Sequence, residues 1–293
     1  MEFGVKKLKS RSATPAELNY FYRNYFGATF MRLTINDLQV FTSGDESKQP
    51  IIFVHGFPYD HTMWDKQVEY LQNDYYCITY DIRGLGGSVI GDGQYTMESY
   101  VDDFLEIISK LKLHKPVLCS LSMGGYMAFR AVERSQDTFS SLILCDTKAE
   151  ADSDEGKLAR ANKIKQINEE GIEAFVNGFV PTCFAESTIN NKSELFNSIL
   201  IKCKTNDPIG VKGALIAMLS RTDTTSYLSR INIPTLLIVG EEDVLTPPET
   251  MELISSKIDN SEFVIIPEVG HMTPIENPAA VNEAIGSFLI QKF

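Results

Sequence analysis

Ser122 is the residue whose surroundings best fit nucleophilic chemistry. A short apolar run at residues 116–118 precedes it, and a helix-like segment at residues 126–133 follows it. A strand, a sharp turn that carries a serine between small residues, and then a helix present a hydroxyl at the end of the strand. Gly124 provides the small residue after the turn, whereas Ser120 stands where glycine is usual. We predict that Ser122 is a nucleophile; the alternative is a plain strand–turn–helix.

His271 is the predicted general base. A serine hydroxyl becomes an effective nucleophile when a base removes its proton and a third group orients that base. His271 follows an apolar run at residues 263–266 and comes after the serine in the chain. His55 precedes the serine, and His61 and His114 fall on or beside helical segments. The alternative for His271 is a structural histidine in a loop.

Two aspartates could orient the base. Asp243 follows an apolar run at residues 234–240 and precedes His271 with one helix and one strand between them. Asp146 follows the strand after the predicted nucleophile, which is a less common place for the acid. We favour Asp243, and Asp146 remains the alternative. The two glutamates before Asp243 are interpreted as a solvated acidic turn.

Two backbone N–H groups are predicted to stabilise the negative charge of a tetrahedral intermediate. Met123 follows the nucleophile at a helix N-terminus, and Phe57 lies in the loop after the apolar run at residues 51–54. Each such donor is typically worth about 3 kcal/mol of transition-state stabilisation. The alternative for residues 55–58 is a simple turn.

Alternating strands and helices must position these groups. The continuous apolar run at residues 51–54 is typical of a strand that is buried on both faces. Further strands are predicted at residues 76–80, 116–118, 142–145, 234–240 and 263–266. Helically spaced segments separate them, with Thr96 and a capping-box pattern at residues 246–249 opening two of the helices. We therefore predict an α/β fold with a doubly wound, mostly parallel sheet.

Residues 148–225 interrupt this alternation. The stretch contains no convincing strand, and its apolar residues recur at helical spacing. Asp207 and Pro208 are typical of the N-cap and the first residue of one of its helices. We predict a helical cap over the carboxyl edge of the sheet, between core segments at residues 29–147 and 226–293. The alternative is an independent helical module.

Residues 1–28 are predicted to form an extension outside the core. Within it, residues 15–26 could form a short helix rich in aromatic residues. The basic run at residues 6–11 is interpreted as a solvated tail, and because no long apolar stretch follows it we expect no secretory signal. After the extension, alternating runs at residues 30–35 and 38–42 predict a β-hairpin.

The composition disfavours several classes of partner. The chain has 27 basic and 39 acidic residues, a formal net charge of −12, which disfavours a nucleic-acid partner. No apolar run approaches the length of about 18 residues that a membrane span needs. A hydrophobic content of 43% is ample for a buried core. The oligomeric state is left open.

The cysteines and histidines indicate neither disulfides nor metal. The five cysteines are scattered without a CxxC pair, and we interpret them as buried free thiols in a reducing cytoplasm. They are Cys77, Cys119, Cys145, Cys183 and Cys203. The four histidines lack the spacing of metal ligands. We expect no metal and no cofactor.

From about residue 30 onward, the chain resembles the α/β-hydrolase family. The matching motifs are His-Gly-x-Pro, Asp-x-Arg-Gly-x-Gly-x-Ser, Ser-Met-Gly-Gly and Gly-His, at residues 55–58, 81–88, 122–125 and 270–271. Three further segments resemble the carboxylesterase and enol-lactonase-like branch. They are residues 55–64, 146–152 and 220–223. The resemblance implies an α/β-hydrolase fold that hydrolyses small carboxylic esters or lactones without a cofactor. Serine at position 122 argues against the dehalogenase and epoxide-hydrolase branches, which carry aspartate there.

The sequence therefore predicts a serine hydrolase that cleaves small carboxylic esters through an acyl-enzyme. Lactone opening or carbon–carbon bond hydrolysis by the same three residues is the alternative. A ligand receptor that kept these residues is a further hypothesis, because fold does not imply function. The predicted partner is a small-molecule ester or lactone, whose identity the sequence leaves open.

Overall fold

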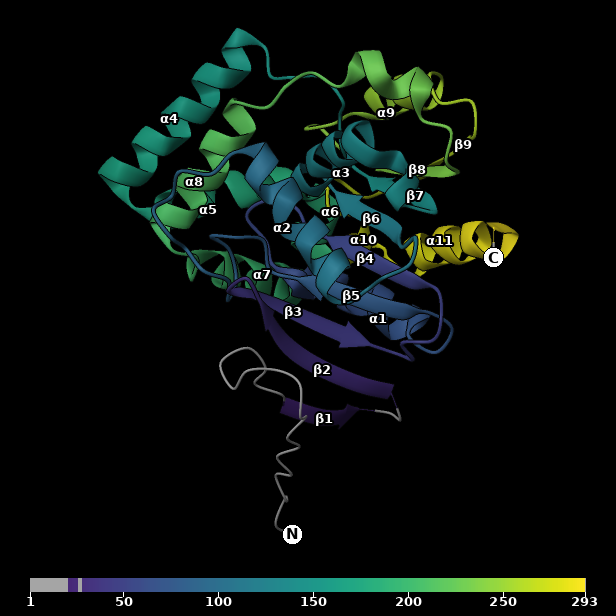
Figure 1. Ribbon diagram of the computed structural model, residues 1–293. Coiled ribbons are helices and arrows are strands. Elements are labelled where there is room, and N and C mark those ends of the chain that lie inside the picture. Colours follow the sequence, from purple (N-terminus) through teal and green to yellow (C-terminus); the bar gives the residue numbers. More distant parts are fainter. Residues whose placement is uncertain (1–20, 26–27, 293) are drawn as a thin grey trace.

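The computed structural model describes residues 21–25 and 28–292 (Figure 1). The helix predicted over residues 15–26 is wrong for Phe21–Tyr25, which form strand β1 and pair antiparallel with β2. Aromatic residues are enriched in strands, and here the neighbouring strand offers the pairing partner. The rest of that predicted helix and the basic run at residues 6–11 lie outside the described residues.

The described strands form one sheet with the order β1-β2-β3-β5-β4-β6-β7-β8-β9. The strands are β1 Phe21–Tyr25, β2 Ala28–Ile35, β3 Leu38–Ser43, β4 Pro50–Val54, β5 Tyr76–Tyr80, β6 Val117–Leu121, β7 Ser141–Cys145, β8 Thr235–Gly240 and β9 Ser261–Ile266. The first three are antiparallel to their neighbours, and β4 to β9 pair in parallel. The predicted α/β fold, mostly parallel sheet and hairpin are confirmed.

Strand β4 is the middle strand of the described sheet. Ile52 of β4 pairs with Ile78 of β5 on one side and with Leu118 of β6 on the other, and all three side chains are fully buried. Burial on both faces explains why these strands are continuously apolar. The register also pairs Val54 with Ser120, so the carboxyl ends of β4 and β6 are level. The loop after β4 therefore begins beside the turn that carries Ser122.

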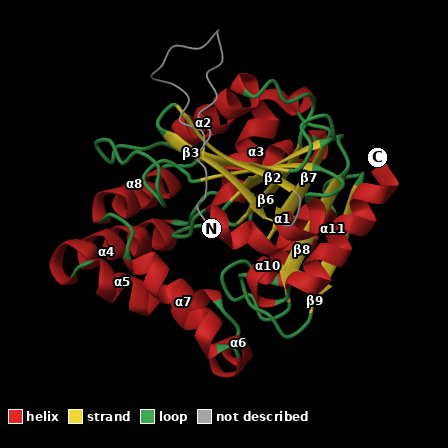
Figure 2. Ribbon diagram, turned by 90° about the horizontal axis from the view of Figure 1, so that it is seen from below, coloured by secondary structure: helices red, strands yellow, loops and turns green. Residues whose placement is uncertain are grey.

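Helices cover both faces of the sheet (Figure 2). The helices of the core are α1 Asp65–Leu71, α2 Met97–Lys110, α3 Met123–Ser135, α9 Pro248–Ser255, α10 Thr273–Glu276 and α11 Pro278–Lys292, with short 3₁₀ turns η1 His61–Trp64, η2 Gln136–Thr138 and η4 Thr225–Arg230. Helix α2 packs on α3 and helix α1 packs on α11. The two pairs lie on opposite sides of the strands, as a doubly wound sheet requires (Figure 2).

Of the two caps predicted for helices of the core, one is confirmed and one is wrong. Thr96 caps α2 by accepting a hydrogen bond from the Ser99 N–H at 3.1 Å. Before α9, however, Pro247 occupies the N-cap position without a side-chain hydrogen bond. The hydroxyl of Thr246 donates instead to Asp243 at 2.6 Å. A capping-box pattern predicts that the threonine hydroxyl accepts from a backbone N–H of the next helix. Here the Thr246 hydroxyl donates to the carboxylate of Asp243 in the preceding loop.

The segment between β7 and β8 is helical throughout, as predicted, and contains no strand. Its helices are α4 Asp154–Glu170, α5 Ile172–Phe179, α6 Glu186–Asn191, α7 Ser193–Lys204 and α8 Pro208–Leu219, with η3 Val180–Cys183 after α5. Asp207 caps α8 as expected, accepting from the Ile209 N–H at 2.7 Å. Helix α4 packs on α5 and α8, to one side of the strands (Figure 1).

An ionic cluster joins the beginning of this helical segment to its end. Asp152 lies before α4 and forms ion pairs with Arg160 of α4, with Arg221 after α8 at 3.0 Å, and with Lys148 at 3.3 Å. Although burial acts to raise it, these cations hold the pKa of Asp152 well below its ordinary value. The beginning and the end of the segment are thereby tied to each other.

Two further findings bear on the sequence predictions. All five cysteines are free and buried, as predicted. Among the described residues, no helix is long and apolar enough to cross a membrane.

Candidate active site

Ser122 occupies a strained turn between β6 and α3. Its backbone has φ 54° and ψ −112°, a conformation that non-glycine residues rarely adopt. The turn requires glycine at Gly124, where an added Cβ would lie 2.5 Å from the Val54 carbonyl oxygen. At Ser120 the strand accommodates a hydroxyl, which is fully buried and donates to the Ile143 carbonyl at 3.4 Å. The Ser120 hydroxyl, which stands where glycine is usual, therefore has a hydrogen-bond partner on the neighbouring strand.

The structure brings the three predicted residues into one hydrogen-bonded chain. Ser122 Oγ lies 2.8 Å from His271 Nε2, and His271 Nδ1 lies 2.8 Å from Asp243 Oδ2. His271 and Asp243 are only 4% and 3% exposed, whereas Ser122 is partly exposed. The serine can thus be reached from solvent while the two groups behind it are shielded.

Asp243 is held by its own loop. Its Oδ1 accepts from the backbone N–H groups of Leu245 at 2.8 Å and Thr246 at 3.0 Å, and its Oδ2 accepts from the Thr246 hydroxyl. Burial opposes the charged form, but the charge and hydrogen bond of His271 and the Thr246 donors hold the pKa of Asp243 below its ordinary value. The carboxylate is therefore ionised and faces the imidazole. No local pattern around Thr246 indicated that its hydroxyl donates to Asp243.

Glu276 organises the loop around His271. Its fully buried carboxyl accepts from the Gly270 N–H at 3.0 Å and from the Ala185 N–H at 2.9 Å. The His271 N–H donates in turn to the Cys183 carbonyl at 3.0 Å. Burial raises the pKa of Glu276. The imidazole loop is thus bonded to the helical segment, a connection that sequence patterns missed because it joins distant parts of the chain.

Asp146, the alternative acid, does not contact His271. It is fully buried, and its oxygens accept from the Gly240 N–H at 2.9 Å and from the Thr273 hydroxyl at 2.5 Å. Burial, together with the charge of Asp243, raises the pKa of Asp146 well above its ordinary value. Asp146 therefore links the end of β8 to the loop after His271.

The two predicted oxyanion donors come from two neighbouring loops. Met123 directly follows Ser122, and Phe57 lies in the loop after β4. Phe57 and Met123 are both buried, and within the described part of the chain neither backbone N–H donates a hydrogen bond. Gly56 brings the β4 loop close to Ser122, since an added Cβ would lie 3.4 Å from Ser122 Cβ. Buried N–H groups are almost always paired in proteins. Two free ones beside a serine hydroxyl can bind a developing negative charge.

His55 fixes this loop and is unavailable as a base. Its Nε2 accepts from the Ile82 N–H at 2.9 Å, so the proton lies on Nδ1, which is 2.8 Å from the Gly56 carbonyl. Burial lowers the pKa of His55. The neutral ring therefore joins the loops after β4 and β5.

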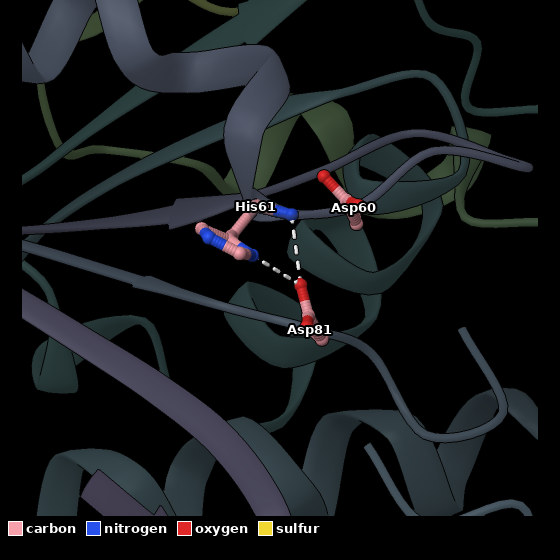
Figure 3. Close-up of side chains that lie close together, drawn as sticks. All are labelled: Asp60, His61 and Asp81. Atoms are coloured by element: carbon pink, nitrogen blue, oxygen red, sulfur yellow. Dashed lines mark hydrogen bonds and ion pairs between the residues drawn. The ribbon is translucent and has the colours of Figure 1, made fainter. Parts of the chain in front are cut away.

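Asp60, His61 and Asp81 form a second cluster of polar side chains (Figure 3). One possible ligand atom of each lies within 4.8 Å of the others. Protein donors already engage them, because Asp81 Oδ1 accepts from His61 Nδ1 at 2.6 Å and from its N–H at 2.9 Å. Asp60 pairs with Lys202 at 2.9 Å and caps η1. We interpret the cluster as a structural link between η1, the β5 loop and α7.

Comparisons with known proteins agree with this fold. A family model described as the alpha/beta hydrolase fold matches residues 49–278. With the parallel sheet and the strained turn after β6, this match shows that the chain belongs to the α/β-hydrolase family of enzymes.

Its relatives include enol-lactonases and an esterase. A 3-oxoadipate enol-lactonase of Acinetobacter baylyi is 26% identical over 255 residues, which cover 86% of this chain and 94% of the relative. Among solved structures, a thermophilic esterase from Thermogutta terrifontis has a TM-score of 0.84 and 35% identity, covering 94% of this chain and 99% of that one. An enol-lactonase from Burkholderia xenovorans has a TM-score of 0.81 and 25% identity, covering 88% and 99%. The predicted resemblance to an enol-lactonase-like branch is confirmed.

Proposed function

We propose that this protein is a serine hydrolase that cleaves small carboxylic esters through an acyl-enzyme. The observation that carries the proposal is the hydrogen-bonded chain from Ser122 through His271 to Asp243, with the serine partly exposed on a strained turn. The same arrangement of nucleophile, base and orienting acid recurs on unrelated folds.

In the proposed mechanism, Ser122 Oγ attacks the substrate carbonyl while His271 Nε2 takes the hydroxyl proton. Asp243 stabilises the imidazolium that forms. The N–H groups of Phe57 and Met123 donate to the oxyanion, each contributing about 3 kcal/mol. Collapse of the intermediate expels the alcohol, which receives the proton from His271. Water then attacks the acyl-enzyme by the same route and releases the acid.

We further propose that residues 148–225 act as a cap that shapes the substrate site. Phe57 packs against Phe175 and Phe179 of α5, with ring centres 6.0 Å and 5.8 Å away. The bond from His271 to the Cys183 carbonyl connects the same segment to the proposed base. The helical segment therefore contacts both the loop of Phe57 and the loop of His271.

The second candidate is lactone opening on the same three residues. The enol-lactonase of A. baylyi, which matches 86% of this chain, supports it, while the esterase of T. terrifontis at 35% identity supports ester cleavage. Carbon–carbon bond hydrolysis has no comparable support. Product analysis on matched panels of esters and lactones separates the two candidates.

The test of the nucleophile is turnover of 4-nitrophenyl acetate and butyrate by the full chain. We expect Ser122→Ala to lower kcat by a factor of about 10⁶, because the attacking oxygen is lost. Ser120→Gly is the matched control at the other serine of the turn and is expected to retain most of the activity. Retained turnover in Ser122→Ala would refute the proposal. Single-turnover acylation with a large ligand-dependent rise in Tm would instead favour a receptor.

A further inference from the structure

Glu276 is a fully buried residue whose two carboxyl oxygens bond different parts of the chain. Its Oε1 accepts from the backbone N–H groups of Gly270 at 3.0 Å and Met272 at 3.2 Å, the two residues that flank His271. Its Oε2 accepts from the Ala185 N–H at 2.9 Å, in the helical segment. One oxygen therefore holds the loop of the proposed base, and the other holds the helical segment.

The backbone N–H groups of residues 270–272 are all engaged in this way. Glu276 accepts the outer two, and the Cys183 carbonyl of η3 accepts the middle one, that of His271, at 3.0 Å. The His271 ring in turn reaches Ser122 Oγ at 2.8 Å. A shift of this loop therefore moves the base relative to the nucleophile, and a misplacement of about 1 Å can lower a rate by about 100-fold.

The helical segment lies in close backbone contact with the same loop. An added Cβ at Gly270 would lie 2.7 Å from the Ala185 nitrogen and 2.9 Å from the Phe184 carbonyl carbon. These distances leave no room for a side chain at position 270, so the two segments meet through their backbones. The Glu276 carboxyl bonds both partners of this contact.

The hydrogen bonds of Glu276 require a carboxylate rather than an amide. Gly270, Met272 and Ala185 all offer N–H donors, and a carboxylate accepts at both of its oxygens. A glutamine at position 276 would turn its NH2 group toward one set of these donors, so either the loop or the helical segment would lose its partner. Burial raises the pKa of Glu276, although the Thr188 hydroxyl and the backbone donors act to lower it.

We propose that Glu276 is a positioning residue that makes the placement of His271 depend on contact with the helical segment. This inference rests on the proposed function and concerns how its base is held. While Oε2 binds the Ala185 N–H, Oε1 is oriented to hold both N–H groups beside His271. Glu276 contacts neither Ser122 nor the imidazole ring, so it acts on the reaction through the backbone of the loop.

The first test measures kcat and KM of Glu276→Gln with 4-nitrophenyl butyrate. We expect kcat to fall by about 100-fold because the base is misplaced. KM should change by less than about threefold, since an effect on the base alone leaves binding of the ester unchanged. Circular dichroism shows whether the variant is folded. If it is not, Glu276→Asp gives the same comparison, because its shorter carboxylate keeps the charge but cannot reach both partners.

Lys192→Met is the matched control. Lys192 lies in the helical segment, and its Nζ donates to the backbone carbonyl of Glu276 at 2.6 Å. The variant therefore removes a bond between the same two parts of the chain and leaves the carboxylate in place. We expect its kcat to stay within about threefold of the wild type, as for the loss of one exposed hydrogen bond. Equal losses in Lys192→Met and Glu276→Gln would overturn the inference.

Proton NMR gives a reading that does not depend on turnover. The proton between His271 Nδ1 and Asp243 Oδ2, which are 2.8 Å apart, should give a far-downfield resonance in the wild type and in Lys192→Met. We expect this resonance to broaden or vanish in Glu276→Gln. An unchanged resonance, or a wild-type kcat, in a folded Glu276 variant overturns the inference while the proposed function stands. Turnover by the wild type no faster than by Ser122→Ala contradicts the proposed function itself, and the resonance still tests the positioning.

Discussion

Asp243 and Asp146 are two buried carboxyl groups with opposite electrostatic environments. Asp243 faces an imidazole and three further donors, which favour its charged form. Asp146 has two donors but also the negative charge of Asp243 nearby, so its neutral form is favoured. Two carboxyl groups whose environments separate their pKa values take different roles. We assign orientation of His271 to the ionised group and a structural link to the neutral one.

This assignment predicts unequal effects of the same substitution at the two positions. Asp243→Asn should lower kcat by about 10⁴, as expected when an acid that fixes the histidine tautomer is replaced by an amide. In Asp146→Asn, a group of the same shape replaces a carboxyl whose charged form is already disfavoured, and we expect a loss in kcat below about tenfold. Steady-state kinetics on a 4-nitrophenyl ester measures both. Equal losses in the two variants would contradict the assignment.

At the scale of elements, α3 can cross close to β4 because the residue at position 124 is glycine, which has no side chain. Gly124 has its backbone so close to Val54 that a Cβ would lie 2.5 Å from the carbonyl oxygen. Gly178 on α5 offers the contrast, since an added Cβ would meet nothing within 4 Å. Both glycines lie in helices, but only the first has a backbone neighbour on the side where a Cβ would stand.

We therefore expect Gly124→Ala to destabilise the fold by about 1–3 kcal/mol, as overpacking does, and to lower kcat because the turn of Ser122 shifts. Gly178→Ala should stabilise the protein by about 0.5–1 kcal/mol, since alanine loses less backbone entropy in a helix. Urea unfolding followed by circular dichroism measures both. A wild-type stability in Gly124→Ala would show that the strand can move aside.

The ionic cluster at Asp152 makes the attachment of the helical segment pH-dependent. Its folded-state pKa lies below the unfolded value of about 3.9. A carboxyl of this kind stabilises the fold fully above its unfolded pKa, and the stabilisation is lost as the pH falls through the lowered folded pKa.

We expect Asp152→Asn to lower the free energy of unfolding by about 3 kcal/mol at pH 7, because it leaves the buried Arg221 and the half-buried Arg160 and Lys148 without a carboxylate. Asp154→Asn, at an exposed residue that pairs with Lys157 at 3.2 Å, should change it by less than about 0.5 kcal/mol. Urea titrations between pH 7 and pH 3 should show the gap between wild type and Asp152→Asn closing below about pH 4. A gap that stays constant with pH would exclude the cluster as its cause.

At the scale of the whole molecule, the site exists because the sheet aligns strands that are far apart in sequence. Strand β4 lies between β5 and β6, so the Phe57 loop and the Ser122 turn emerge side by side. Asp243 and His271 lie in the loops after β8 and β9, at the same edge of the sheet. Parallel strands place their carboxyl ends together, which is why such sheets bind ligands there.

Local patterns were sufficient to predict most of the elements and the three residues of the hydrogen-bonded chain. Continuous apolar runs identified the strands of the parallel sheet, because burial on two faces disfavours polar side chains. The edge strand β9 is an exception, since its run is only partly buried. Ser122, Asp243 and His271 could be selected because each of them comes after a predicted strand of the sheet. These signals depend on neighbouring residues alone, so the amino-acid sequence carries them in full.

Tertiary structure decided what depends on partners from elsewhere in the chain. Pairing with β2 makes Phe21–Tyr25 a strand rather than part of a helix. The Thr246 hydroxyl donates to Asp243 instead of capping α9, and the choice between the two aspartates rests on which carboxyl the imidazole reaches. Each outcome is set by strand register and by the path of loops. These features become visible only in the folded protein. A hydrogen-bond partner is determined by its position in space and not by its distance along the chain.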